Sequence, residues 1–150
     1  MESKFLSFLI LISLMIVGCS ELSTKTSKDY EELKEYLEKT HSFKLTPKIN
    51  SVYVLTDKGC MPCNKKFAKK LEQIDKDSSL VLITAKQTSI NLSGFDLSSK
   101  KNVLSDVYFS NDYPFLRRSK VVYLGDKKID SVIELNAREL DNQFSVIFKN

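Results

Sequence analysis

Two cysteines, Cys60 and Cys63, are the residues of this chain whose types and spacing point most directly to chemistry. Met61 and Pro62 lie between them, and Lys58 stands just before them in the sequence. A thiolate beside a second thiol can attack a disulfide, and the second thiol can then release the product. The sequence therefore predicts a redox-active disulfide, Cys60–Cys63, supported by the other three residues of this segment.

The segments on either side of the cysteines favour a reactive sulfur at Cys60. The apolar, β-branched run Ser51–Thr56 predicts a buried strand, and residues 62–75 follow a helical pattern. Cys60 would therefore stand at a helix start, where unpaired N–H groups and the helix dipole favour a thiolate over a thiol. Nearby cations would add to this effect, and the nearest in sequence are Lys58, Lys65 and Lys66.

Helical spacing separates the roles of the two cysteines. Four residues recur at the spacing of one helix face, namely Cys63, Phe67, Leu71 and Ile74. Cys63 should therefore begin the buried stripe and act as the resolving thiol, while Cys60 stays exposed as the attacking sulfur. Lys69 and Lys70 lie outside this stripe, and we expect them to belong to a solvated helix face.

The third cysteine, Cys19, lies in a different kind of sequence. A short polar head precedes residues 5–17, an apolar run that is too short for a comfortable membrane span. The run ends at Gly18-Cys19 and resembles the signal of bacterial lipoproteins, whose cysteine is acylated and becomes the new N-terminus. We therefore expect a signal peptide over residues 1–18, a lipid on Cys19 and a tether over residues 19–27. An ordinary signal peptide or an anchor helix is the alternative.

Export would strengthen the redox interpretation of the other two cysteines. With Cys19 lipidated, Cys60 and Cys63 can pair only with each other within one chain. An exported domain lies in an oxidising compartment, where a disulfide persists. A bridge over two residues closes too small a loop to stabilise a fold much, so redox exchange explains the pair better than a structural role does.

Composition narrows the remaining functions. The net charge of +4 comes from lysines scattered among acids, so we expect no nucleic-acid partner. A closed zinc site needs four ligands, and the sequence has no second cluster of Cys and His. We therefore expect no metal and no other cofactor. Two thiolates can also hold Cu(I), which leaves a copper carrier as an alternative.

Hydrophobic patterning predicts the elements before and after the cysteine segment. A helix should run from Thr26 or Ser27 to about Lys39, which places His41, the one histidine, in a surface or capping role. A short strand should follow over residues 42–45. Residues 80–83 predict a second buried strand, which should lie parallel to the first because a helix joins them.

The last third of the chain predicts a helix, a hairpin and a second helix. Residues 101–108 fit the first helix, and residues 121–124 and 129–135 fit a β-hairpin with a turn at Gly125. Asn136 and Glu139 have the spacing of a capping box, which should begin an amphipathic terminal helix that carries Ala137, Leu140, Phe144 and Ile147.

This order of elements resembles the thioredoxin fold from about Phe43 to Asn150, with an extra N-terminal helix. Cys60, Pro62 and Cys63 match the Cys-Gly-Pro-Cys of thioredoxins, with Met61 where glycine is usual. The resemblance implies an α/β fold over residues 28–150, a thioredoxin-like three-layer sandwich whose central mixed β-sheet is flanked by helices.

The chain departs from the thioredoxin pattern at three places. Gly59 stands where tryptophan is usual, and Val54 stands where thioredoxins carry a buried acid that helps proton transfer from the second cysteine. Ser119 and Lys120 fill the positions of the cis-proline that packs against the disulfide, and Pro114 is the nearest proline. We expect no cis-proline in this loop, and exchange that is slow by thioredoxin standards.

The resemblance implies a lipid-anchored thiol–disulfide oxidoreductase of the bacterial cell envelope. Its partners would be thiols or disulfides of client proteins and, through Cys19, a membrane; we expect a monomer with its domain outside the cytoplasm. The direction of exchange stays open. The second alternative, besides the copper carrier, is a thioredoxin-fold binding module with little redox activity.

Overall fold

The computed structural model describes residues 26–72, 74, 77–85, 90–93, 102–106 and 113–149. The predicted signal peptide, Cys19 and the tether up to residue 25 lie outside this range, while residues 26–41 form the N-terminal helix. Among the described residues, no helix combines the length and the apolar character that crossing a membrane requires.

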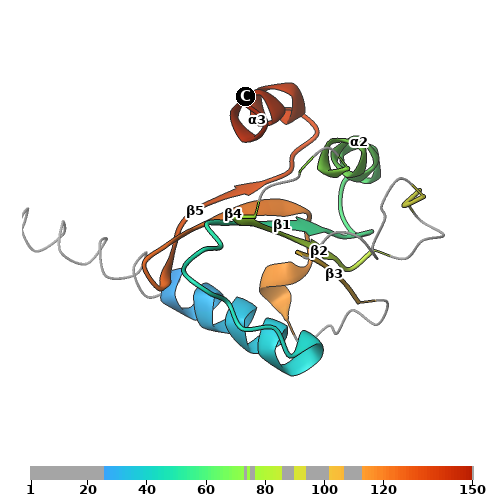
Figure 1. Ribbon diagram of the computed structural model, residues 1–150. Helices are drawn as coiled ribbons and strands as arrows, with labels where there is room; N and C mark the ends of the chain where they lie inside the picture. Colours follow the sequence, from blue (N-terminus) through green and yellow to red (C-terminus); the bar gives the residue numbers. More distant parts are fainter. Residues whose placement is uncertain are drawn as a thin grey trace, which may run out of the picture.

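A mixed five-stranded sheet forms the centre of the protein, in the order β3-β2-β1-β4-β5 (Figure 1). The strands are β1 (Ser51–Leu55), β2 (Ser79–Ile83), β3 (Val103–Ser105), β4 (Lys120–Gly125) and β5 (Lys128–Glu134). β1, β2 and β3 are parallel, whereas β4 is antiparallel to β1 and β5 to β4. The predicted parallel pairing of the first two strands and the predicted hairpin are therefore confirmed.

Helices cover both faces of the sheet (Figure 1). The N-terminal helix and the short 3-10 helix η1 (Pro114–Leu116) lie on one face, and α2 (Met61–Leu71) and α3 (Leu140–Ile147) lie on the other. Every residue of β1 and β2 is buried, because the near-continuous apolar runs of these strands have partners on both sides. The α/β class with a mixed sheet between helices is confirmed.

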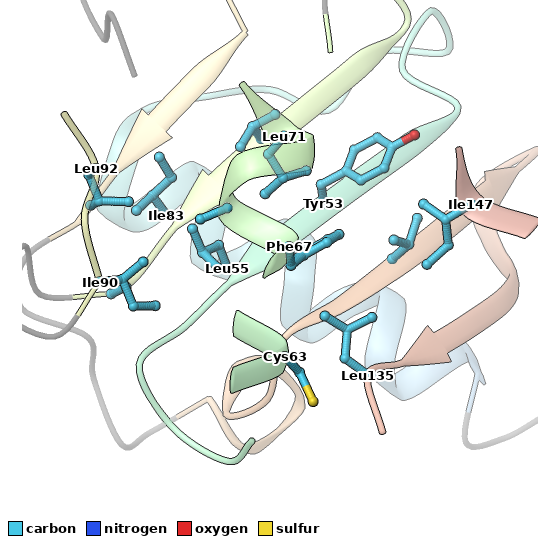
Figure 2. Packing of buried hydrophobic residues seen from close by; sticks show 14 of the residues in the cluster. Tyr53, Leu55, Cys63, Phe67, Leu71, Ile83, Ile90, Leu92, Leu135 and Ile147 are labelled. Carbon is cyan, nitrogen blue, oxygen red and sulfur yellow. The ribbon is translucent and has the colours of Figure 1, made fainter. Parts of the chain in front are cut away.

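Side chains of β1 alternate between two hydrophobic clusters. Tyr53 and Leu55 pack with α2 and α3 in the first cluster, where Phe67 and Leu71 are almost fully buried. Figure 2 shows Cys63 at one end of this cluster, near Leu135. Because Cys63 begins the buried stripe of α2, the hydrophobic core holds the helix start in place.

The second cluster joins the other face of the sheet to the N-terminal helix. Leu33 and Leu37 are fully buried there, as their helical spacing predicts, and Tyr36 is buried between them. Val54 of β1 belongs to this cluster and not to the one that contains Cys63. The side chain of Val54 therefore faces away from α2.

Two predicted elements are wrong. Residues 42–45 form no strand, because Ser42 has a φ of 51° and its N–H and that of Phe43 bond to carbonyls of the preceding helix. Of the helix predicted over residues 101–108, residues 101, 107 and 108 lie outside the described part of the chain, and Val103–Ser105 form the strand β3, with Val103 in register with Val81. The outer edge of β2 is free to pair with another strand, and pairing with it decides the conformation of these three residues.

The boundaries of two helices also differ from their predictions. α2 ends at Leu71 and not at residue 75, although Ile74 still packs against the first cluster. α3 begins after Glu139 without a side-chain cap, so the predicted capping box is wrong. Gln143 takes over part of this role, since its side-chain oxygen accepts the N–H of Asn136 at 3.0 Å.

Candidate dithiol site

Cys60 and Cys63 form a disulfide at the start of α2, with 5.2 Å between their Cα atoms. Cys60 is the N-cap residue, and its sulfur accepts the N–H of Cys63 at 3.3 Å. Pro62 occupies the first turn, where a missing N–H leaves no bond unmade. A negative charge on the sulfur of Cys60 would therefore meet a backbone N–H donor and the positive end of the helix dipole.

The two sulfurs differ in exposure, as the helical spacing predicts. Cys63 is 1% exposed and belongs to the first hydrophobic cluster. Cys60 is only partly buried and lines a cleft at the protein surface. A second molecule can thus approach the sulfur of Cys60 directly, whereas the buried sulfur of Cys63 is within reach of Cys60 and not of solvent.

Side chains that precede and follow it in the sequence hold the turn before Cys60 by hydrogen bonds. Gly59 has a φ of +83°, a left-handed conformation that a side chain makes unfavourable. The side-chain amide of Asn64, itself 1% exposed, donates to the carbonyl of Lys58 at 2.9 Å. The N–H of Lys58 in turn bonds to the hydroxyl of Thr56. These bonds fix the backbone that leads into the dithiol.

Ser119 joins the loop before β4 to the end of β1. Its buried hydroxyl accepts the N–H of Thr56 at 3.0 Å and donates to the carbonyl of the same residue at 3.4 Å. The carbonyl of Ser119 accepts the N–H of Leu135. One side chain therefore satisfies two backbone groups that the end of the strand would otherwise leave unpaired.

A cleft of about 530 Å³ opens beside Cys60. The loop before β4, the end of β5 and the start of α3 form its other walls. The residues that line it are Lys58, Gly59, Cys60, Asn64, Arg118, Ser119, Glu134, Leu135, Asn136, Ala137, Glu139 and Gln143. The cleft is large enough to receive a side chain or a short segment of another protein next to the exposed sulfur.

Glu134 holds two cations at the wall of this cleft. Its carboxylate lies 2.7 Å from Arg118 and 3.7 Å from the ammonium group of Lys120. Burial lowers the pKa of Lys120, and Glu134 partly opposes this effect. The ammonium group also lies 4.4 Å from the ring centre of Phe115. The loop before β4 is therefore fastened to β5 by charge as well as by backbone bonds.

The N-terminal helix reaches the same loop from the opposite face of the sheet. The carboxylate of Glu32 accepts the N–H of Phe115 at 2.6 Å. Phe115 belongs to η1, which precedes Arg118 and Ser119 in the chain. The extra N-terminal helix is thus part of the framework that positions the cleft.

The structure brings together all the predicted site residues that it describes. Met61 packs beside the disulfide against the first cluster, and Lys58 lines the cleft with Cys60. The bond from Tyr113 to Pro114 is trans, since the described residues contain no cis peptide bond, so the expected lack of a cis-proline here is confirmed. Among the described residues, no three His, Cys, Asp or Glu side chains lie close enough to hold a metal ion.

Sequence patterns missed the polar residues that hold the cleft. Asn64 carries a signal of burial, because it and Ala68 are uncharged residues one helical turn apart among lysines, on the side of the helix that also carries Phe67. Arg118 and Glu134 lie 16 positions apart and meet because the hairpin pairs Glu134 with Lys120, two residues after Arg118. No local pattern in the sequence marks such a pair.

Comparison with known proteins assigns no family to this arrangement. No protein-family model matches the chain, and no curated protein sequence and no solved structure matches it.

Proposed function

We propose that this protein is a lipid-anchored thiol–disulfide oxidoreductase that exchanges disulfides with client proteins outside the cytoplasm. The observation that carries the proposal is the Cys60–Cys63 disulfide, whose exposed sulfur caps a helix beside a cleft and whose second sulfur is buried. Bacterial lipoprotein signals resemble residues 5–19, which supports a lipid on Cys19 and an extracytoplasmic domain.

The arrangement of the elements supports a thioredoxin-like fold. The cysteine helix α2 and the terminal helix α3 share one face of the sheet, and a parallel β1–β2 pair precedes an antiparallel β4–β5 hairpin (Figure 1). The loop that ends at Ser119 lies beside the dithiol, which is the place of the cis-proline loop in thioredoxins. A trans Pro114 and a buried serine replace that proline in this chain.

Exchange would proceed in two displacements. With the dithiol reduced, the thiolate of Cys60 attacks a client disulfide, forms a bond to one client sulfur and releases the other as a thiolate. Cys63 then loses a proton to water, attacks the sulfur of Cys60, restores the Cys60–Cys63 bond and releases the second client thiolate. The client gains two electrons and the protein loses two, and the reverse sequence oxidises a client dithiol.

Substitution of each cysteine tests the proposal. Cys60→Ser should abolish reduction of a protein disulfide such as those of insulin, because the attacking sulfur is gone. Cys63→Ser should still attack but should accumulate a mixed disulfide, which non-reducing electrophoresis and mass spectrometry detect. Lys44→Gln serves as a control, because it removes an exposed lysine away from the cysteine helix and leaves both sulfurs in place. Wild-type protein that exchanges no disulfide under these conditions would refute the proposal.

A further inference from the structure

The solvent side of α2 is a surface of four lysines, Lys65, Lys66, Lys69 and Lys70, which we call the lysine face. All four side chains are exposed, and they recur at the spacing of one helix face, away from the buried stripe. α2 has no acidic residue from Met61 to Leu71. Within the part of the chain that the structure describes, no ion pair involves any of these lysines.

Helix stability does not explain this concentration of charge. Lys65 and Lys69 are four residues apart, as are Lys66 and Lys70, and like charges at this spacing destabilise a helix. The N-terminal helix shows the opposite arrangement, because Lys34 pairs there with Glu31 and Lys39 with Glu35. The lysine face therefore keeps its positive charge at some cost to its own helix.

The lysine face begins next to the reactive sulfur. Lys65 follows Cys60 by five positions, which corresponds to a rise of about 8 Å along the helix axis. Charges at this separation act on one another at physiological ionic strength, where the screening length is about 8 Å. The start of the lysine face therefore lies about one and a half helical turns from Cys60.

Two kinds of anionic partner fit such a face, namely a membrane surface and an acidic protein. The point at which the chain enters the folded domain favours an acidic protein over a membrane surface. The N-terminal helix, which leads back toward Cys19, lies on the face of the sheet opposite α2 (Figure 1). Only residues 20–25 separate Cys19 from this helix. The chain therefore enters the domain on the side of the sheet away from α2, which leaves the lysine face open to a protein.

We propose that the lysine face is the docking surface for clients that carry acidic residues near the disulfide or dithiol to be exchanged. This inference rests on the proposed function and adds a class of client to it. Complementary charge would raise the rate and affinity of encounter with such clients, and would align their sulfur with Cys60.

A binding experiment tests this without any redox step. The full chain with Cys60→Ser and Cys63→Ser, in uncharged detergent, is titrated into a fluorescent peptide rich in glutamate and into its glutamine counterpart. The test variant adds Lys65→Gln, Lys66→Gln, Lys69→Gln and Lys70→Gln. The matched control removes the same charge at four other exposed lysines, with Lys28→Gln, Lys44→Gln, Lys48→Gln and Lys127→Gln.

The acidic peptide should bind more tightly than its neutral counterpart. The test variant should lose about tenfold in affinity at low salt, the control variant should lose little, and high salt should remove the difference. Equal losses in both variants would show a general effect of net charge and would overturn the inference. It would also be overturned if the protein with Cys60→Ser and Cys63→Ser alone fails to bind the acidic peptide. A test variant that keeps its affinity for the peptide and loses only its binding to phosphatidylglycerol vesicles would overturn it as well.

Kinetics with intact cysteines separates this inference from the proposed function. Exchange with a neutral peptide disulfide at a measurable rate supports the function, and a higher kcat/KM for an acidic peptide disulfide supports the docking surface. Binding of the acidic peptide without exchange of either disulfide would refute the function alone. Exchange of both disulfides at equal rates would refute the docking surface alone.

Discussion

Single side chains determine how the turn before the dithiol is held. Ser119 is the clearest case, because its hydroxyl bonds to both the N–H and the carbonyl of Thr56. Thr56 is fully buried and Ser119 is 3% exposed, so water cannot replace these bonds. One oxygen atom therefore joins the loop that walls the cleft directly to the strand that leads to Cys60.

Ser119→Ala should destabilise the protein by about 1–3 kcal/mol, because it leaves a buried backbone N–H without a partner. Urea unfolding measures the change. Ser145→Ala is the matched control, since Ser145 is exposed and bonds only to the carbonyl of Asn142, and its effect should stay within about 0.5 kcal/mol. Equal stability of the two variants would show that the Ser119 hydroxyl does not hold the turn.

At the scale of residues, the sequence predicted what depends on local spacing. The different exposure of Cys60 and Cys63 follows from helical periodicity and from the position of Pro62, both of which are local. The hydrogen bonds of Asn64 and Ser119 became visible only in the structure. Ser119 lies 63 positions from its partner Thr56, and no pattern within one element reports a contact between two loops.

At the scale of elements, the end of the N-terminal helix contains a histidine that favours its neutral form. His41 packs against the ring of Tyr36, with 5.6 Å between ring centres, and Tyr36 donates to Asp106 at 3.0 Å. The Nε2 atom of His41 is buried and has no hydrogen-bond partner among the described residues. Burial lowers the pKa of His41, and the nearby Asp106 carboxylate only partly opposes this effect.

This lowered pKa predicts a loss of stability in mild acid. As the pH falls below the ordinary range of histidine, the unfolded chain takes up the proton before the folded protein does, so the free energy of unfolding decreases. His41→Gln should remove this part of the pH dependence between about pH 5 and 8. Urea unfolding across that range measures it, and since the chain has one histidine, no other imidazole contributes. Parallel stability curves for both proteins would contradict the prediction.

The helices and strands differ in how strongly their own residues predict them. β1, β2, the hairpin and α2 were predictable because long apolar runs or a regular period mark them. The sequence predicts a helix at β3, because three residues are too few to show the alternation of a strand. Pairing with β2 decides their conformation instead. The capping box failed for a related reason, because Gln143 from the following helix competes for the N–H of Asn136.

At the scale of the whole molecule, the three layers follow from the apolar character of both faces of β1 and β2. A strand that lacks alternating polar residues needs packing partners on both of its faces. The sequence contains amphipathic helices before and after the strands that can fill this role. The order of the strands was less accessible, because it depends on where β3 and the hairpin attach. The proposed attachment to a membrane concerns Cys19, which lies outside the described part of the chain.

Cys19→Ala tests that attachment. The substitution removes the sulfur that would carry the lipid, so the mature chain should leave the membrane fraction and appear in the soluble extracytoplasmic fraction. Fractionation measures its location, and intact mass measures the lipid on the wild type. Cys60→Ala is the control, which should stay with the membrane. A Cys19→Ala chain that still sediments with membranes would indicate an anchor helix.

The contact between Glu32 and Phe115 gives the N-terminal helix a mechanical role. Any pull on the chain upstream of residue 26 loads this helix first, and the helix is bonded directly to the loop that walls the cleft. Tension would therefore reach the loop through the Glu32 carboxylate, and it would reach the central sheet through the packing of Leu33 and Leu37. Force applied to the N-terminal segment would thus act on one wall of the cleft as well as on the core.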